Sequence, residues 1–189
     1  MKRLLINVIP KLANKKIDLK SKIRTIPHFP KPGIMFRDIT TLLKDKEAFN
    51  YILDHLYERY KDKKINVVAG IESRGFILGG ALAHKLGIGF VPLRKPGKLP
   101  WFVDSVEYAL EYGTDKLEMH IDAIKPEDNV LIVDDLLATG GTARAAAELI
   151  KRRSASIAEF VFIIELSDLK GREKLKGFDV YSMVFFEGE

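Results

Sequence analysis

Short apolar runs recur along the chain, separated by segments in which apolar residues return every three or four positions. The runs are mostly continuous rather than alternating with polar residues, which is typical of strands that are buried on both faces. We expect five such strands, at residues 67–69, 88–93, 130–133, 157–164 and 180–185.

The segments between these runs have the periodicity of helices. Five apolar residues at helical spacing indicate one helix: Phe49, Ile52, Leu53, Leu56 and Tyr60. Asp45 is placed to cap its first turn. Two more helices are expected near 74–86, where Gly87 would end the helix, and near 142–153. Strands that alternate with helices predict an α/β fold with a central, mostly parallel sheet flanked by helices. Ligands of such sheets bind beyond the carboxyl ends of the strands.

Two segments do not follow this pattern. Residues 26–33 contain three prolines and a glycine, which predicts a stiff loop because each proline fixes its own φ and restricts the preceding residue. In residues 108–121, Leu117, Met119 and Ile121 alternate with polar residues, which predicts a half-exposed strand. An exposed hairpin there would form a flexible flap over a site at the edge of the sheet.

The composition is that of a soluble globular protein, since 47% of the 189 residues are hydrophobic and 30% are charged. The sequence contains no cysteine, which excludes disulfides and thiolate-bound zinc and fits a cytoplasmic protein. The longest apolar stretch, 76–93, contains His84 and Lys85, so we expect no membrane span. The histidines are scattered, without the spacing of a metal site.

The formal net charge of +5 arises in the N-terminal part of the chain. Residues 1–24 carry eight basic side chains and one acidic side chain, so the remainder is slightly acidic. We interpret residues 1–17 as a basic, solvated extension and residues 18–189 as a single domain. A basic arm can also bind nucleic acid or an anionic membrane, but that alternative rests on charge alone. We therefore expect neither a nucleic acid nor a membrane as a partner.

The stretch after residues 130–133 carries the clearest chemical signal. Asp134 and Asp135 are expected to end that strand, and residues 138–142 (ATGGT) to open a helix. Two glycines allow a tight turn close to a ligand, and the free N–H groups of a helix start favour an anion. Neighbouring carboxylates suit hydroxyl groups or a hydrated magnesium ion. A phosphate beside hydroxyls describes a phosphorylated sugar. The signatures of a Walker loop and of a dinucleotide-binding turn are absent from the sequence.

Basic residues follow two other predicted strands. Arg74 lies between a strand and a helix, where a guanidinium and backbone amides suit a diphosphate. Arg94, Lys95 and Lys98 follow the next strand, at the same edge of the sheet, and suit the same group. A solvated basic turn is the alternative interpretation of these three residues.

Together these segments resemble the type I phosphoribosyltransferases, and the adenine branch of that family in particular. Five motifs in order along the chain carry the resemblance: FPKPGIMFRDIT (29–40), IESRGF (71–76), RKPGKLP (94–100), LEYG (110–113) and DDLLATGGT (134–142). The resemblance implies the family fold, with a base-binding hood from the N-terminal segment and a flexible flap. It also implies an enzyme of purine salvage that transfers the 5-phosphoribosyl group from phosphoribosyl diphosphate to adenine, giving AMP and diphosphate.

The resemblance assigns phosphoribosyl diphosphate to two groups of residues. Asp134 and Asp135 would bind the ribose hydroxyls, and Mg²⁺ would reach the site through substrate and water near these carboxylates, without a direct protein ligand. The phosphate would bind the loop Ala138, Thr139, Gly140, Gly141 and Thr142. The diphosphate would bind Arg74, Arg94, Lys95 and Lys98.

The resemblance also suggests how the base is held and activated. Glu111 would manage a proton at the imidazole edge of the purine, so Glu111 and Arg74 are the expected catalytic residues. Adenine would lie between Phe36 and Leu136, with backbone groups of Met35 and Arg37 at its edge. A homodimer is expected on the same basis.

Three alternatives stay open at this point. The base could be hypoxanthine, guanine or xanthine. The chain could be a regulator that keeps the fold only to sense a ligand, because a fold does not determine a function. It could also be a nucleic-acid binder that acts through its basic arm.

Overall fold

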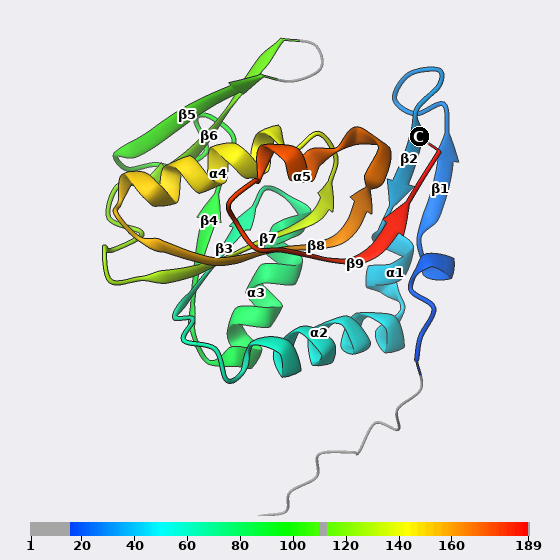
Figure 1. Cartoon of the computed structure of the whole chain (residues 1–189), viewed down its shortest axis with the longest axis horizontal. Coiled ribbons are helices and arrows are strands. Elements are labelled where there is room, and N and C mark those ends of the chain that lie inside the picture. The colour runs from blue at the N-terminus through cyan, green and yellow to red at the C-terminus, as the bar shows by residue number, and fades with distance from the viewer. Residues whose placement is uncertain (1–15, 110–112, 189) are drawn as a thin grey trace, which may run out of the picture.

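Five parallel strands form the central sheet, in the order β4-β3-β7-β8-β9 (Figure 1). Their bounds are Val67–Ile71 (β3), Gly89–Leu93 (β4), Asn129–Leu137 (β7), Ser156–Leu166 (β8) and Val180–Phe186 (β9). The computed structural model describes residues 16–109 and 113–188. All five predicted strands are present and the sheet is parallel, so the predicted α/β architecture is confirmed.

Helices cover both faces of this sheet. The helices α2 (Lys46–Tyr60) and α3 (Arg74–Leu86) lie on one face, and α4 (Gly141–Arg152) and α5 (Gly171–Lys174) lie on the other (Figure 1). The short helix α1 (Thr40–Lys44) precedes α2, and single 3₁₀ turns occur at Lys20–Lys22 (η1) and Ser167–Leu169 (η2). Within the described residues, no helix is both long enough and apolar enough to cross a membrane.

Each face of the sheet has its own apolar core, because successive residues of a strand point to opposite faces. Leu131 and Val133 of β7 pack in the core beneath α2 and α3. Val130 and Ile132 pack in the second core, beneath α4. The continuous apolar runs of the sequence are therefore buried on both sides, as predicted.

The predicted helix ends are confirmed at two positions. The Asp45 side chain accepts hydrogen bonds from the backbone N–H groups of Glu47 and Ala48, at 3.0 and 3.1 Å, and so caps α2. Gly87 ends α3 in the left-handed conformation with φ of 70°, which glycine adopts without strain.

Two strands of the N-terminal segment were not predicted. The strand β1 (Arg24–Pro27) pairs antiparallel with β2 (Met35–Asp38). The expected stiff loop is therefore shorter than residues 26–33, and the motif at 29–40 contains a strand in addition to a loop. These four-residue strands are too short to show a period, and the prolines at the end of β1 and in the turn after it indicated a loop instead. Pro27 is tolerated because it lies at the end of β1.

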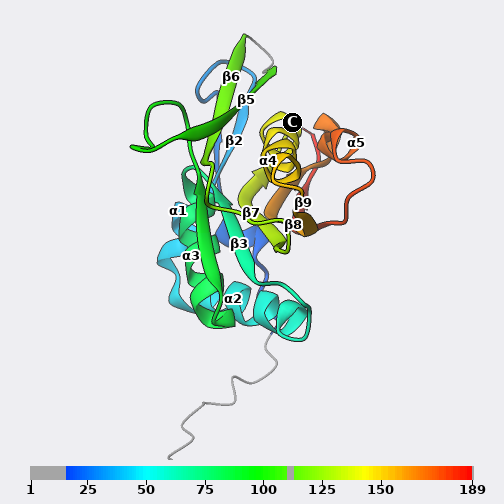
Figure 2. The same ribbon diagram turned by 90° about the vertical axis from the view of Figure 1, so that its left-hand side faces the viewer.

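An antiparallel hairpin stands beside α4. It consists of β5 (Val103–Ala109) and β6 (Thr114–His120), and Figure 2 shows it projecting beyond the sheet. Leu117 and Met119 are fully buried while their neighbours are more exposed, so the predicted alternation is confirmed. Ile121 lies beyond the strand and is 37% exposed.

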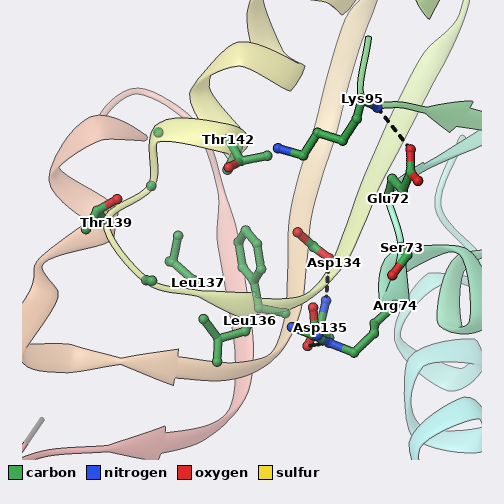
Figure 3. Close-up of a pocket in the computed structure, with 15 residues that line it drawn as sticks. Glu72, Ser73, Arg74, Lys95, Asp134, Asp135, Leu136, Leu137, Thr139 and Thr142 are labelled. Atoms are coloured by element: carbon green, nitrogen blue, oxygen red, sulfur yellow. Dashed lines mark hydrogen bonds and ion pairs between the residues drawn. The ribbon is translucent and has the colours of Figure 1, made fainter. Parts of the chain in front are cut away.

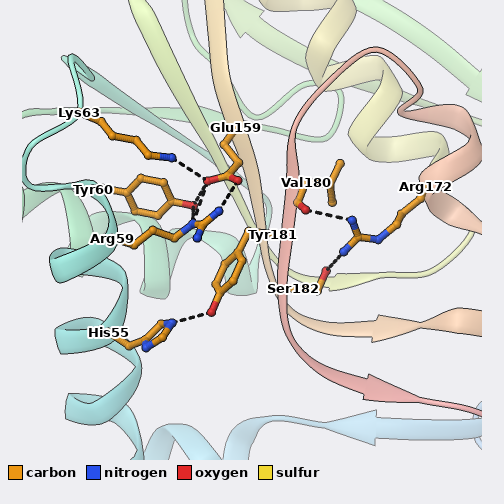
Figure 4. A network of polar contacts seen from close by, with 9 residues as sticks. All are labelled: His55, Arg59, Tyr60, Lys63, Glu159, Arg172, Val180, Tyr181 and Ser182. Carbon is orange, nitrogen blue, oxygen red and sulfur yellow. Dashed lines mark hydrogen bonds and ion pairs between the residues drawn. The ribbon is translucent and has the colours of Figure 1, made fainter.

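A buried carboxylate ties α2 to the sheet (Figure 4). Glu159 of β8 accepts hydrogen bonds from Arg59 Nε and Nη2, at 3.0 and 2.6 Å, and from the Tyr60 hydroxyl at 2.6 Å. Burial comes first among the causes that raise the pKa of Tyr60, so the hydroxyl remains a donor. The Arg59 guanidinium also lies over the Tyr181 ring of β9, 4.0 Å from its centre. These contacts join α2 to β8 and β9.

Candidate active site

A pocket of about 310 Å³ opens at the carboxyl ends of β3 and β7 (Figure 3). From β3 the chain continues to β4 on one side, and from β7 it continues to β8 on the other. Such a reversal of strand order leaves a crevice at the edge of a parallel sheet. The pocket is lined by Glu72, Ser73, Arg74, Lys95, Asp134, Asp135, Leu136, Leu137, Ala138, Thr139, Gly140, Gly141, Thr142, Ala143 and Phe162.

The two neighbouring acids lie inside β7 rather than at its end. The prediction that they end the strand is wrong, because β7 continues to Leu137 and its last residues still pair with the long strand β8. The helix α4 likewise begins at Gly141, after a connection of three residues. The carboxylates are thus held by the sheet, which is more rigid than a loop.

The connection after β7 turns on glycine. Gly140 has φ of 77°, a left-handed conformation that glycine adopts without strain. A Cβ atom on Gly171, the first residue of α5, would lie 2.2 Å from the Ala138 carbonyl oxygen. Both glycines are therefore required, because α5 packs against the loop after β7 too closely for a side chain at either position. Nothing in the sequence indicated this role of Gly171.

A salt bridge connects α3 to the acids of β7. Arg74 Nε donates to Asp135 Oδ2 at 2.5 Å, and Asp135 is only 4% exposed. The Asp134 carboxylate accepts the backbone N–H of Asp135 at 2.8 Å. Burial and the neighbouring Asp135 carboxylate raise the pKa of Asp134 well above its usual range. The start of α3 comes this close because Gly75 has no side chain, since a Cβ atom there would lie 2.6 Å from the Val133 carbonyl oxygen.

The four predicted diphosphate ligands occupy different positions. Arg74 and Lys95 line the pocket, whereas Arg94 and Lys98 are not among its lining residues. Lys95 Nζ pairs with Asp115 and donates to the Tyr108 hydroxyl at 2.5 Å, so it also contacts the hairpin. Cations from two connections therefore meet at the edge of the sheet.

The residues predicted to bind a base are only partly brought together. Leu136 lines the pocket, but Met35, Phe36 and Arg37 of β2 do not. The Phe36 ring lies close to Arg74 of the pocket lining, and the distance from the ring centre to the Arg74 guanidinium carbon is 5.8 Å. Arg37 is buried and packs over the Phe186 ring at 4.2 Å.

The predicted catalytic residue Glu111 lies outside the described residues. The described part of the hairpin ends close to the loop after β7. The Ala109 carbonyl oxygen would be 3.0 Å from a Cβ atom on Gly141, and the Tyr108 ring 3.4 Å from it. The strand that leads to Glu111 therefore ends against the first residue of α4.

Five residues of the pocket lining were not predicted individually as site residues, although all but Phe162 lie in segments that were predicted to bind the substrate: Glu72, Ser73, Leu137, Ala143 and Phe162. Glu72 and Ser73 belong to the motif at 71–76, so the motif itself was a usable signal. Phe162 belongs to a continuous buried run and looked like a core residue. Among the described residues, no group of three or more histidine, aspartate or glutamate side chains is arranged to hold a metal ion.

The chain is similar to known proteins over most of its length. A family model described as the phosphoribosyl transferase domain matches residues 39–186. The adenine phosphoribosyltransferase of Parvibaculum lavamentivorans is 56% identical over 174 residues, which cover 91% of this chain and 99% of that protein.

Solved structures agree with these sequence matches. The crystal structure of adenine phosphoribosyltransferase from Thermoanaerobacter pseudethanolicus has a TM-score of 0.86 and 51% identity, and the match covers 88% of this chain and 97% of that one. The Saccharomyces cerevisiae enzyme, in complex with adenine and an imino-altritol bisphosphate, has a TM-score of 0.83 and 42% identity, covering 88% and 96%. On these grounds, and on the site geometry, the chain belongs to the adenine phosphoribosyltransferases of the phosphoribosyltransferase family.

Proposed function

We propose that the protein transfers the 5-phosphoribosyl group from phosphoribosyl diphosphate to adenine, giving AMP and diphosphate. The observation that carries this proposal is one pocket lined by the glycine loop, by the two carboxylates of β7 and by two cations. The glycine loop suits the 5-phosphate, the carboxylates suit the two ribose hydroxyls, and the cations suit the diphosphate. This activity is a step of purine salvage.

The ribose 5-phosphate would bind at the loop 138–142. The N–H groups at the start of α4 have no partner within the helix and favour an anion, and the hydroxyls of Thr139 and Thr142 add donors. Asp134 and Asp135 would accept hydrogen bonds from the ribose hydroxyls. They would also stabilise the positive charge that develops on the ribose as the bond to diphosphate breaks.

The leaving diphosphate would bind Arg74, Arg94, Lys95 and Lys98. Magnesium fits this site through substrate oxygens and water, because Asp134 and Asp135 offer oxygen atoms but fewer than the six ligands that Mg²⁺ takes. When bound, Mg²⁺ would neutralise charge on the diphosphate.

Adenine would lie between Phe36 and Leu136, and backbone groups of Met35 and Arg37 would contact its edge. Support comes from Leu136 in the pocket lining and from the position of the Phe36 ring beside Arg74. The segment with β1 and β2 would then form a hood over the base. The β5–β6 hairpin would close as a flap that excludes water, with Glu111 accepting or donating the purine proton.

We also propose that residues 18–189 form a single domain, with residues 1–17 as a basic extension, and that the enzyme is a cytoplasmic homodimer. Size-exclusion chromatography with light scattering tests the dimer. Deleting residues 1–17 and measuring both turnover and DNA retention tests whether the extension serves the reaction or a nucleic acid.

The central experiment combines the protein with phosphoribosyl diphosphate, Mg²⁺ and one purine base at a time. We expect AMP from adenine, and much slower formation of nucleotide from hypoxanthine, guanine or xanthine. Formation of IMP, GMP or XMP in preference to AMP would reassign the base, and no nucleotide from any base would refute the proposed activity.

A further inference from the structure

The Glu72 carboxylate forms the centre of a cluster of cations at the edge of the pocket. It accepts the backbone N–H of Lys95 at 2.9 Å (Figure 3). It also forms salt bridges with Lys98 Nζ and, at 3.3 Å, with Arg94 Nε. The Glu72 side chain is only 9% exposed, while those of Arg94 and Lys98 are 31% and 46% exposed.

Glu72 is ionised at neutral pH. Burial raises its pKa, but hydrogen bonds from Lys98, from the Lys95 backbone and from Arg94 outweigh burial and lower the pKa to about 2. A full negative charge therefore lies in the lining of a pocket that is proposed to bind a highly charged anion.

Arg94 and Lys98 have two possible partners in the proposed reaction. Glu72 binds both side chains, and neither of them is among the residues that line the pocket. A diphosphate would compete for the same positive charges, and a side chain that turns toward a phosphate oxygen moves away from the Glu72 carboxylate. We infer, on the basis of the proposed function, that Glu72 is a positioning residue. It binds Arg94 and Lys98 before diphosphate arrives, and diphosphate must displace the Glu72 carboxylate from these two side chains in order to bind them.

The charge of Glu72 is not needed to hold this loop in place. Arg94 and Glu118 exchange two backbone hydrogen bonds, at 2.9 and 2.7 Å. The Gly97 N–H donates to the Glu118 carboxylate at 3.1 Å, and Lys95 Nζ pairs with Asp115. Removing the charge therefore frees two cations without releasing the loop.

The test is Glu72→Gln, which keeps the shape of the side chain and an oxygen for the Lys95 N–H. We expect diphosphate with Mg²⁺ to bind about three to ten times more tightly in titration calorimetry, the effect of removing one nearby, partly screened charge. The KM for phosphoribosyl diphosphate should fall, and kcat should also fall because diphosphate leaves more slowly. A purely structural role would instead raise KM and weaken diphosphate binding.

Glu118→Gln is the matched control. Its carboxylate holds the same loop through a backbone N–H but forms no salt bridge with Arg94 or Lys98 among the described contacts. Its affinity for diphosphate should stay within about twofold of the wild type. Unchanged or weaker binding in Glu72→Gln, or equal tightening in both variants, overturns the inference.

A measurement on the wild-type protein does not depend on how the variant folds. In a crystal structure with Mg²⁺ and diphosphate, Lys98 Nζ should have left Glu72 for a phosphate oxygen. Bound diphosphate with Lys98 still on Glu72 overturns the inference. Calorimetry needs no adenine, so a failure of AMP formation and a failure of this inference are seen separately.

Discussion

Replacing Gly171 by alanine would test whether α5 supports the phosphate loop. A Cβ atom at this position would lie 2.2 Å from the Ala138 carbonyl oxygen and 2.9 Å from Leu137 Cδ1. Gly171 is not among the residues with positive φ, so its backbone conformation is one that alanine can adopt. The only obstacle to alanine is the steric clash of its Cβ atom. The nearest atom belongs to the backbone of the loop, which must therefore move by about 1 Å to restore a normal contact.

A displacement of that size has two measurable consequences. Overpacking should cost about 1–3 kcal/mol of stability, which lowers the Tm by several degrees in a chain of this length. A misplacement of about 1 Å at a reactive site can cost about a hundredfold in rate. We expect kcat/KM for phosphoribosyl diphosphate to fall about tenfold to a hundredfold, because the loop is proposed to bind its phosphate.

Steady-state kinetics and thermal unfolding measure both effects. Gly80→Ala is the control, since Gly80 lies inside α3 and a Cβ atom there would meet nothing within 4 Å. That variant should keep its activity and gain about 0.5–1 kcal/mol. If Gly171→Ala has the kcat/KM and Tm of the wild type, the loop does not depend on α5.

Three further predictions concern single side chains. Glu111→Ala should lower kcat at saturating substrates by about a hundredfold or more, and a kcat equal to the wild type would exclude the proton-transfer role. Tyr60→Phe should cost about 1–2 kcal/mol in urea unfolding, because a buried hydrogen bond to Glu159 is lost; no change would mean that the hydroxyl adds nothing. The pKa of Asp38 is lowered to about 2, chiefly by a hydrogen bond from Arg24, so its contribution to stability is present above pH 4 and is lost as the pH falls toward 2. Asp38→Asn should therefore be about 1 kcal/mol less stable than wild type at pH 7 and nearly equal at pH 2; a constant difference would contradict this.

The phosphate loop illustrates how far sequence reasoning reached. The two acids, the glycines and the following helix could be predicted because they adjoin one another along the chain. The end of β7 could not be predicted, because it depends on continued pairing with β8. The local periodicity of a sequence does not show which strands pair or how far the pairing continues. The strands β1 and β2 were missed for the same reason, since each is only four residues long.

By itself the sequence determined the alternation of strands and helices, the caps at Asp45 and Gly87, and the residues of the pocket that belong to contiguous motifs. These features depend on periodicity and on the chemistry of neighbouring residues. Only the tertiary structure decided that Glu72 binds Arg94 and Lys98 and that Gly171 supports the phosphate loop. Those contacts join residues that are distant along the chain, and packing of the elements determines which of them meet.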